Sequence, residues 1–227
     1  MYQENKPQYR ILLLIALAHG LNDLIQGVIP SIYPALQSKY ALTMAQVGVI
    51  TLCYQLSASI LQPLVGNYTD KHPKPYSQVL GMAFTTMGIV SLSLASSYTA
   101  ILCSVVFIGV GSSVFHPESS RVAFLASGGR RSFAQAIFQL GGNFGTALAP
   151  LLVILLLFSK KIIDERVVEE SHQGNLIWFA GFSIFAMLIL LLIGKWRSIL
   201  LKLLKKKAKK PVVLPNLTRA QIRNSMI

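Results

Sequence analysis

Six stretches of this 227-residue chain are each long and apolar enough to cross a lipid bilayer as a helix. Crossing the ~30 Å hydrocarbon core takes about 20 mostly apolar residues. The predicted spans cover residues 11–36, 44–66, 78–96, 99–117, 133–158 and 176–194. Only 13% of the residues are charged, against about a quarter in a soluble domain. These features predict an all-α membrane protein with six transmembrane helices.

The basic residues predict which side of the membrane each segment occupies. With the N-terminus inside, all but four of the 21 Lys and Arg residues fall in inner segments, where positive charge is enriched because it resists translocation. We therefore expect both termini to be cytoplasmic. The net charge of +13 then needs no nucleic-acid partner, since no recognition motif accompanies it.

Polar side chains occupy one face of several spans. In the first span, His19, Asn22, Asp23 and Gln26 fall within one narrow stripe, because a helix turns 100° per residue. The second, fourth and fifth spans have similar polar faces, whereas the third and sixth carry no ionisable residue between their ends. The order is thus two spans with a polar face followed by one without ionisable residues, and it repeats after three helices. It indicates two three-helix units related as a 3+3 inverted repeat.

These polar faces predict a binding site inside the bundle. A charge near the centre of a span costs about 2.5–3.5 kcal/mol on insertion scales, so it usually faces a wet cavity and is functional. The predicted substrate- and proton-binding residues are His19, Asp23, Gln26, Gln55, His116, Glu118, Gln139 and Asn143.

Two roles for these residues stay open. Asp23 or Glu118 is the candidate proton-coupling carboxylate, because a buried carboxyl group can take up and release a proton during a cycle. His19 or His116 could share that proton. Alternatively, the His19 and Asp23 pair only fixes the packing of helices. Neither a metal nor a cofactor is expected, and the two isolated cysteines predict no metal site.

Two local motifs resemble those of the major facilitator superfamily. The loop GNYTDKHPKP at residues 66–75 resembles the signature between the second and third spans of that family, with Gly66, Asp70, Lys71 and Lys74 matching and prolines at two other positions. In the fifth span, Gly145 and Pro150 keep the spacing of the glycine-proline motif of drug/proton antiporters. The arginine that many members carry in span four is missing from ILCSVVFIGVG.

This resemblance implies half of a major-facilitator fold, since such transporters have twelve spans in two six-helix bundles. It implies a bacterial inner-membrane antiporter rather than an enzyme, exporting a small polar drug of the phosphonate type in exchange for protons. The gating residues it implies are Gly66, Asp70, Lys71, Lys74, Gly145 and Pro150. An intramembrane protease is the weaker alternative, because the sixth span lacks the histidine that a rhomboid-like site needs.

The C-terminal segment divides the chain into two parts. Residues 1–194 are predicted to form the transmembrane bundle, and residues 195–227 a basic cytoplasmic linker that begins with an interfacial helix. Thr218 and Gln221 resemble a capping box just before a seventh span. The expected partner is therefore a missing C-terminal half. A second copy of the chain in a homodimer, or a fragment without function, are the alternatives.

Overall fold

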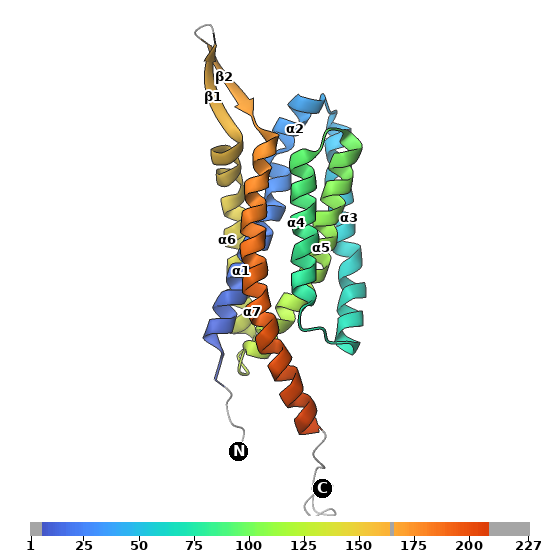
Figure 1. Cartoon of the computed structure of the whole chain (residues 1–227), viewed down its shortest axis with the longest axis vertical. Coiled ribbons are helices and arrows are strands. Elements are labelled where there is room, and N and C mark those ends of the chain that lie inside the picture. The colour runs from blue at the N-terminus through green and yellow to red at the C-terminus, as the bar shows by residue number, and fades with distance from the viewer. Residues whose placement is uncertain (1–5, 164–165, 209–227) are drawn as a thin grey trace, which may run out of the picture.

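The computed structural model describes residues 6–163 and 166–208 and shows long helices that run side by side along one axis (Figure 1). The start of α1 and the end of α7 lie at one end of the bundle, the terminal end, and a β-hairpin extends from the opposite, hairpin end. The elements are α1 (Tyr9–Ser31), α2 (Tyr33–Tyr40), α3 (Met44–Lys71), α4 (Ser77–Leu94), α5 (Tyr98–Ala126), α6 (Arg131–Leu157), β1 (Phe158–Ile163), β2 (Arg166–Ser171), a 3₁₀ turn (Gln173–Leu176) and α7 (Ile177–Ala208).

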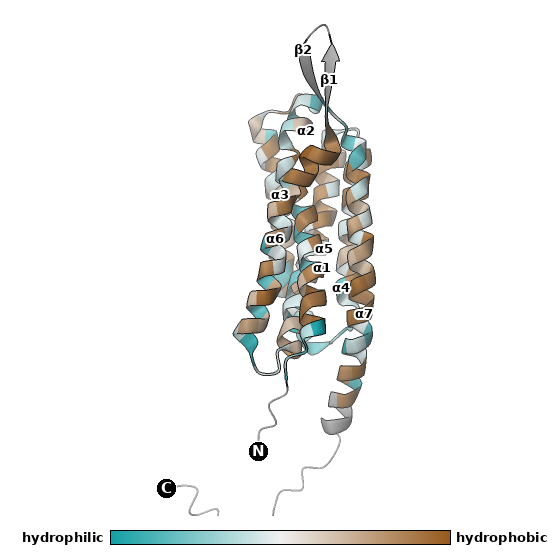
Figure 2. Cartoon of the chain, turned by 90° about the vertical axis from the view of Figure 1, so that its left-hand side faces the viewer, coloured by the Kyte–Doolittle hydropathy of each residue, from teal (hydrophilic) through white to brown (hydrophobic). Residues whose placement is uncertain are grey.

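Six of these helices are long and apolar enough to cross a membrane, which confirms the predicted all-α fold with six spans. The helices α1 and α5 lie at the centre of the packing: α6 packs along α1, α3 and α4 pack along α5, and α7 packs against α1 and α4. Figure 2 shows that hydrophobic residues cover much of the length of every span. This arrangement is compatible with two three-helix units.

Local sequence signals explain several helix ends. The Thr43 side chain accepts a hydrogen bond from the Gln46 backbone and forms a capping box at the start of α3. Ser97 caps α5 in the same way through the backbone N–H of Ala100. Gly128 and Gly129 have φ values of +56° and +92°, which glycine adopts without steric cost, and they turn the chain from α5 into α6.

Two helices run past their predicted ends, α3 to Lys71 and α5 to Ala126, and the structure differs from the predicted segments at three further places. The first span breaks at Ile32, between Pro30 and Pro34, because proline lacks the N–H that a continuous helix needs and disfavours a helical residue before it. The expected interfacial helix after residue 194 is instead the last part of α7, which runs on without interruption to Ala208. The capping box and the seventh span predicted beyond residue 208 lie outside the described residues.

The third difference is the hairpin between α6 and α7. Strands β1 and β2 pair antiparallel, with Phe158 opposite Ser171 and Ile163 opposite Arg166. Sequence reasoning did not predict strands here. The β-branched pairs at residues 162–163 and 167–168 were the available signal, since such residues favour strands.

The buried apolar residues form two separate cores. One core lies toward the terminal end and includes Leu12, Ile15 and Phe115, and the other lies toward the hairpin end and includes Ile25 and other residues of α1, α4, α5 and α6. Along α1 the two cores are separated by residues 19–23, which carry His19, Asn22 and Asp23. A polar layer therefore divides the bundle near its middle.

Candidate functional site

His19 is the most firmly held member of this polar layer. Its side chain is 2% exposed, and its ring stacks on that of Phe138 with 3.9 Å between centroids. Its Nδ1 lies 2.8 Å from the backbone oxygen of Phe138. Because a carbonyl oxygen only accepts, Nδ1 must carry the proton, which leaves Nε2 directed at Asp23.

Asp23 is the acidic centre of the layer. Its Oδ2 lies 3.1 Å from Nε2 of His19, and its Oδ1 lies 3.7 Å from Nε2 of His116. Oδ1 also accepts hydrogen bonds from the amides of Asn22, at 3.0 Å, and Gln26, at 3.5 Å. Among the described residues, its ion-pair partners are these two histidines, so no permanent positive charge is shown to neutralise this carboxylate.

Gln26 connects three helices through its side-chain amide. Nε2 lies 3.4 Å from Nε2 of His116 on α5. Oε1 accepts hydrogen bonds from the hydroxyl of Tyr54 on α3, at 2.5 Å, and from the hydroxyl of Ser112 on α5, at 3.3 Å. Tyr54 and Ser112 were not among the predicted site residues, although they belong to the second and fourth spans, which have polar faces. We call His19, Asp23, Gln26 and His116 the central cluster.

A polar cavity of about 280 Å³ adjoins the central cluster. It lies between α1, α3 and α6, and a 2.8 Å hydrogen bond joins two of its lining residues, Tyr33 and Thr51. Its volume exceeds that of a single water molecule, so it can hold a small solute with water. Its lining residues are Asp23, Gln26, Gly27, Pro30, Tyr33, Thr51, Tyr54, Gln55 and Thr146.

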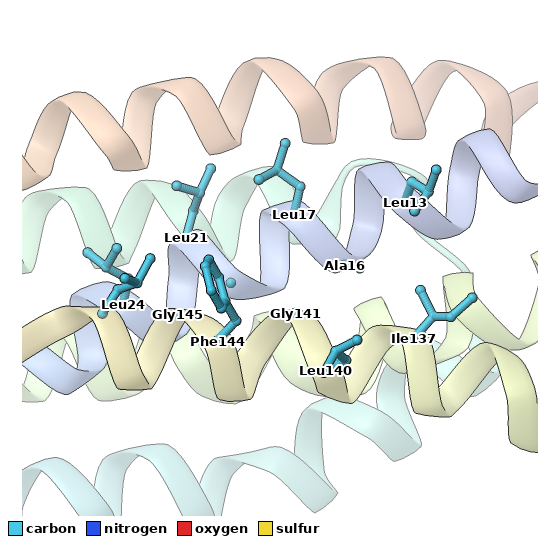
Figure 3. Close-up of a pocket in the computed structure, with 12 residues that line it drawn as sticks. Leu13, Ala16, Leu17, Leu21, Leu24, Ile137, Leu140, Gly141, Phe144 and Gly145 are labelled. Atoms are coloured by element: carbon cyan, nitrogen blue, oxygen red, sulfur yellow. The ribbon is translucent and has the colours of Figure 1, made fainter.

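A second hollow lies along the contact between α1 and α6 (Figure 3). Its volume is about 450 Å³, but its lining side chains, which include Leu17, Leu21, Leu140 and Phe144, offer no hydrogen-bonding group. Of these two hollows, only the polar cavity offers the hydrogen-bonding groups that fix a polar solute.

Glycines bring α6 close enough to α1 to complete the site. A Cβ built at Gly145 would lie 1.8 Å from the backbone oxygen of Gly20, so the two backbones touch here. A Cβ at Gly142 would lie 2.4 Å from Cε1 of His19 and 2.6 Å from Oδ2 of Asp23. The glycines of α6 thus leave the space that the central cluster fills.

Glu118 lies in a different group of charges at the terminal end. Its side chain is fully buried, and its Oε2 accepts hydrogen bonds from the guanidinium of Arg197 and, at 2.7 Å, from the hydroxyl of Ser77. A nitrogen of Arg121 lies 3.0 Å from its Oε1, although not in hydrogen-bond alignment. Arg121 also pairs with Asp70. We call Asp70, Glu118, Arg121 and Arg197 the terminal charge network.

The structure thus brings only some of the predicted site residues together. The central cluster holds His19, Asp23, Gln26 and His116, and Gln55 lines its cavity. Gln139 donates to Asn143 at 3.4 Å on an exposed part of α6, and neither residue bonds to the cluster.

The predicted gating residues are also divided between places. Asp70 joins the terminal charge network, and Lys74 lines a hollow between α3 and α4. Gly66 and Lys71 lie on the last two turns of α3, whereas Gly145 and Pro150 belong to α6. Arg197 was missed because it lies on the basic face of the predicted interfacial helix. Arg121 could have been found, since it lies three residues after Glu118 on one helix.

Comparison with known sequences identifies the family. The sequence profile of the Major Facilitator Superfamily matches residues 15–223, so the chain belongs to this superfamily, whose members are membrane transporters rather than enzymes. The chain is 46% identical to the fosmidomycin resistance protein of Escherichia coli (strain K12) over 210 residues, which are 92% of the chain and 49% of that protein. It is 41% identical to YfnC, an uncharacterized transporter of the same type from Bacillus subtilis (strain 168), over 89% of the chain and 47% of that protein.

A solved structure has the same fold. A bacterial homologue of the human lysosomal transporter Spinster, in an inward-facing and unoccupied conformation, superimposes with a TM-score of 0.64 at 18% identity. The match covers 85% of this chain and 43% of that one. The chain thus spans about half the length of the curated relatives that it matches.

Proposed function

We propose that this chain forms the first six-helix bundle of a proton-coupled exporter in the bacterial inner membrane, with both termini in the cytoplasm. The 46% identity to a fosmidomycin resistance protein supports drug efflux as the activity. The distribution of Lys and Arg supports the orientation, since positive charges are retained on the inner side.

The position of Asp23 carries the proposal. It is a carboxylate at mid-bundle, 16% exposed, beside a polar cavity, and its partners are imidazole and amide groups. Carboxylates at this depth typically belong to ion pathways and proton relays. Asp23 therefore carries the coupled proton, and His19 or His116 shares it.

Glu118 is the weaker candidate for the coupling carboxylate. Its carboxylate pairs with Arg197 and Arg121, which keep their charge, so protonation of Glu118 would leave the buried guanidinium group of Arg197 without a counter-charge. The terminal charge network instead serves the inner gate. There the pairing of Asp70 with Arg121 links the end of α3 to α5, while Gly66 and Lys71 belong to the last turns of α3 and Lys74 to the loop that follows.

A second six-helix bundle is the proposed partner. In the apolar stretch that would cross the membrane, only 17% of the residues of α3 and 28% of those of α6 are buried, against 44–56% in the other spans. The polar cavity lies between these same two helices and α1. A partner bundle over α3 and α6 would close the cavity, and rocking of the two bundles would open it to either side in turn. Lipid alone would leave Gln139 and Asn143 facing acyl chains.

The proposed solute is a small polar drug of the fosmidomycin type. The cavity lining offers amide, hydroxyl and carboxylate groups, which suit a polar molecule. Gln55 lies in this lining, and Gln139 and Asn143 on α6 extend the polar surface that would face the partner bundle.

The decisive experiment measures proton-coupled export in inverted membrane vesicles that contain this chain together with a second bundle. Asp23→Asn keeps the size of the side chain but cannot exchange a proton, so export should fall to the level of vesicles without the transporter. Glu170→Gln is the matched control, because it makes the same change on the exposed hairpin and should export normally. Undiminished coupled export by Asp23→Asn would reject the proposed role.

The same vesicles separate the possible partners. The chain without a second bundle should not export. Export by the chain alone would favour a homodimer, and failure of every combination despite normal insertion would favour a fragment without function.

A further inference from the structure

The central cluster contains the donor atoms of a metal site. Nε2 of His19, Nε2 of His116 and a carboxylate oxygen of Asp23 lie within 4.8 Å of one another. Two imidazole nitrogens and one carboxylate oxygen form a ligand set that proteins use for Zn²⁺ and other divalent ions of the first transition row.

The tautomer of His19 is already set for coordination. Its Nδ1–H is held by the backbone oxygen of Phe138, which leaves the lone pair of Nε2 directed toward Asp23. A metal-binding histidine almost always donates its other ring N–H in this way, because the bond fixes the tautomer and the ring orientation. Stacking on Phe138 and the close approach of Gly142 allow this ring little freedom to turn away.

The distances between donor atoms are near those of a coordinated ion. Bond lengths of about 2.0–2.1 Å in a tetrahedral site place neighbouring ligand atoms about 3.3 Å apart. The observed separations are 3.1 Å from Nε2 of His19 to Oδ2 of Asp23, and 3.7 Å from Nε2 of His116 to Oδ1, the other oxygen of the same carboxylate. Coordination through a single oxygen of Asp23 therefore requires a small movement of His116 or of the carboxylate. His116, which is 26% exposed, has the space to move.

We propose that His19, Asp23 and His116 bind one divalent cation of the Zn²⁺ class when the coupled proton has left them, because metal ligands must be deprotonated. Three protein ligands leave a fourth position open, as in sites where zinc binds a water or a substrate. Asp23 also lines the polar cavity, so the open position faces the space assigned to the solute.

Such an ion would correct a mismatch of charge in the cavity. No lining residue of the cavity carries a Lys or Arg side chain, and its only charge is the carboxylate of Asp23. An anionic solute would therefore be repelled by the bare site. A divalent ion on Asp23 gives the pair a net charge of about +1 and an open ligand position, which an oxyanion can occupy.

The test is a titration of the full chain, purified in lipid nanodiscs, with Co²⁺ as a spectroscopic substitute for Zn²⁺. We expect one equivalent of Co²⁺ to bind with the visible absorption of a four-coordinate ion, and Zn²⁺ to displace it. Asp23→Asn and His116→Ala should each weaken binding at least tenfold. His172→Ala, which removes a histidine at the hairpin end, should bind as the unchanged chain does.

A further variant separates coordination from folding. His116→Cys, made with Cys53→Ser and Cys103→Ser, keeps a donor atom at the site and should add a strong near-ultraviolet sulfur-to-cobalt band. Absence of stoichiometric binding would overturn the proposal, as would binding that His116→Ala leaves unchanged or that lacks the sulfur band in His116→Cys.

This inference fails separately from the proposed transport function. Proton-coupled export that persists in a strong chelator, with no cobalt bound, would reject the ion and retain the exporter. Cobalt binding by the central cluster without any export would retain the ion site and reject the exporter.

Discussion

The bundle buries two carboxylates in contrasting surroundings. Glu118, at the terminal end, has no exposed surface and pairs with Arg197 and Arg121. Asp23, at mid-bundle, keeps 16% exposure, and its charged partners are histidines. Arginine stays protonated at any physiological pH, whereas imidazole gains and loses a proton near neutrality.

This contrast is the reason for proposing a structural role for Glu118 and a proton-coupling role for Asp23. The pair of Glu118 and Arg197 has one stable state, because removing the charge of either leaves the other buried without its main counter-charge. The cluster around Asp23 can change its charge with little displacement, since its histidines and amides can exchange donor and acceptor roles. The two proposed roles therefore rest on the partners of each carboxylate and not on its depth.

The largest expected effect comes from opening the terminal charge network. Arg197→Met keeps the apolar stem but leaves Glu118 without its main counter-charge. Removing one member of a buried ion pair costs about 3–5 kcal/mol, so the free energy of unfolding should fall by about 3 kcal/mol, with Arg121 still in place. Thermal unfolding in detergent measures this loss.

A double variant checks that the cause is the unpaired charge. Glu118→Gln combined with Arg197→Met removes both charges and should recover most of the lost stability. If Arg197→Met melts at the same temperature as the unchanged chain, the network does not stabilise the fold, and the contrast with Asp23 fails.

A smaller effect is expected from crowding the central cluster. Gly142→Ala would place a methyl group 2.4 Å from His19 and 2.6 Å from Asp23, so one of them must move. Overpacking of this kind costs about 1–3 kcal/mol. Proton-coupled export should be lost as well, because the pairing of the two side chains is disturbed.

Gly181→Ala is the matched control for this substitution. It lies on α7, where an added Cβ meets nothing within 4 Å, and alanine is favoured over glycine in a helix by roughly 1 kcal/mol. Stability should therefore stay the same or rise. Equal behaviour of the two alanine variants in export and unfolding would show that Gly142 is not needed to shape the cluster.

The smallest change in stability is expected at the exposed edge of the terminal charge network. The side chain of Asp70 is 68% exposed, and exposed ion pairs contribute about 0–1 kcal/mol. Asp70→Asn should unfold almost as the unchanged chain does, yet slow export if its pairing with Arg121 belongs to a gate. A rate of export equal to that of Glu170→Gln would remove Asp70 from the gate.

Much of the fold and part of the site could be predicted from local patterns. Apolar length predicts the six spans, and the 3.6-residue period places His19, Asp23 and Gln26 on one face of α1, because both depend only on residues near one another in the chain. The second and fourth spans, whose polar faces were expected to avoid lipid, do place polar side chains beside Gln26. The exclusion of Gln139 and Asn143 from the cluster could not be predicted, because it depends on the rotation of α6 about its axis.

The sequence by itself determined the membrane class, the six spans and the polar face of α1, since hydrophobicity and helix periodicity act over short stretches of chain. It indicated the superfamily through the resemblance of local motifs. Only the tertiary structure decided that Glu118 meets Arg197, 79 residues away, while Asp23 meets His116. Those pairings depend on which helices pack together and at what height. Close contacts between distant backbones, such as that of Gly20 with Gly145, fix which helices are neighbours and how far one is shifted along the other.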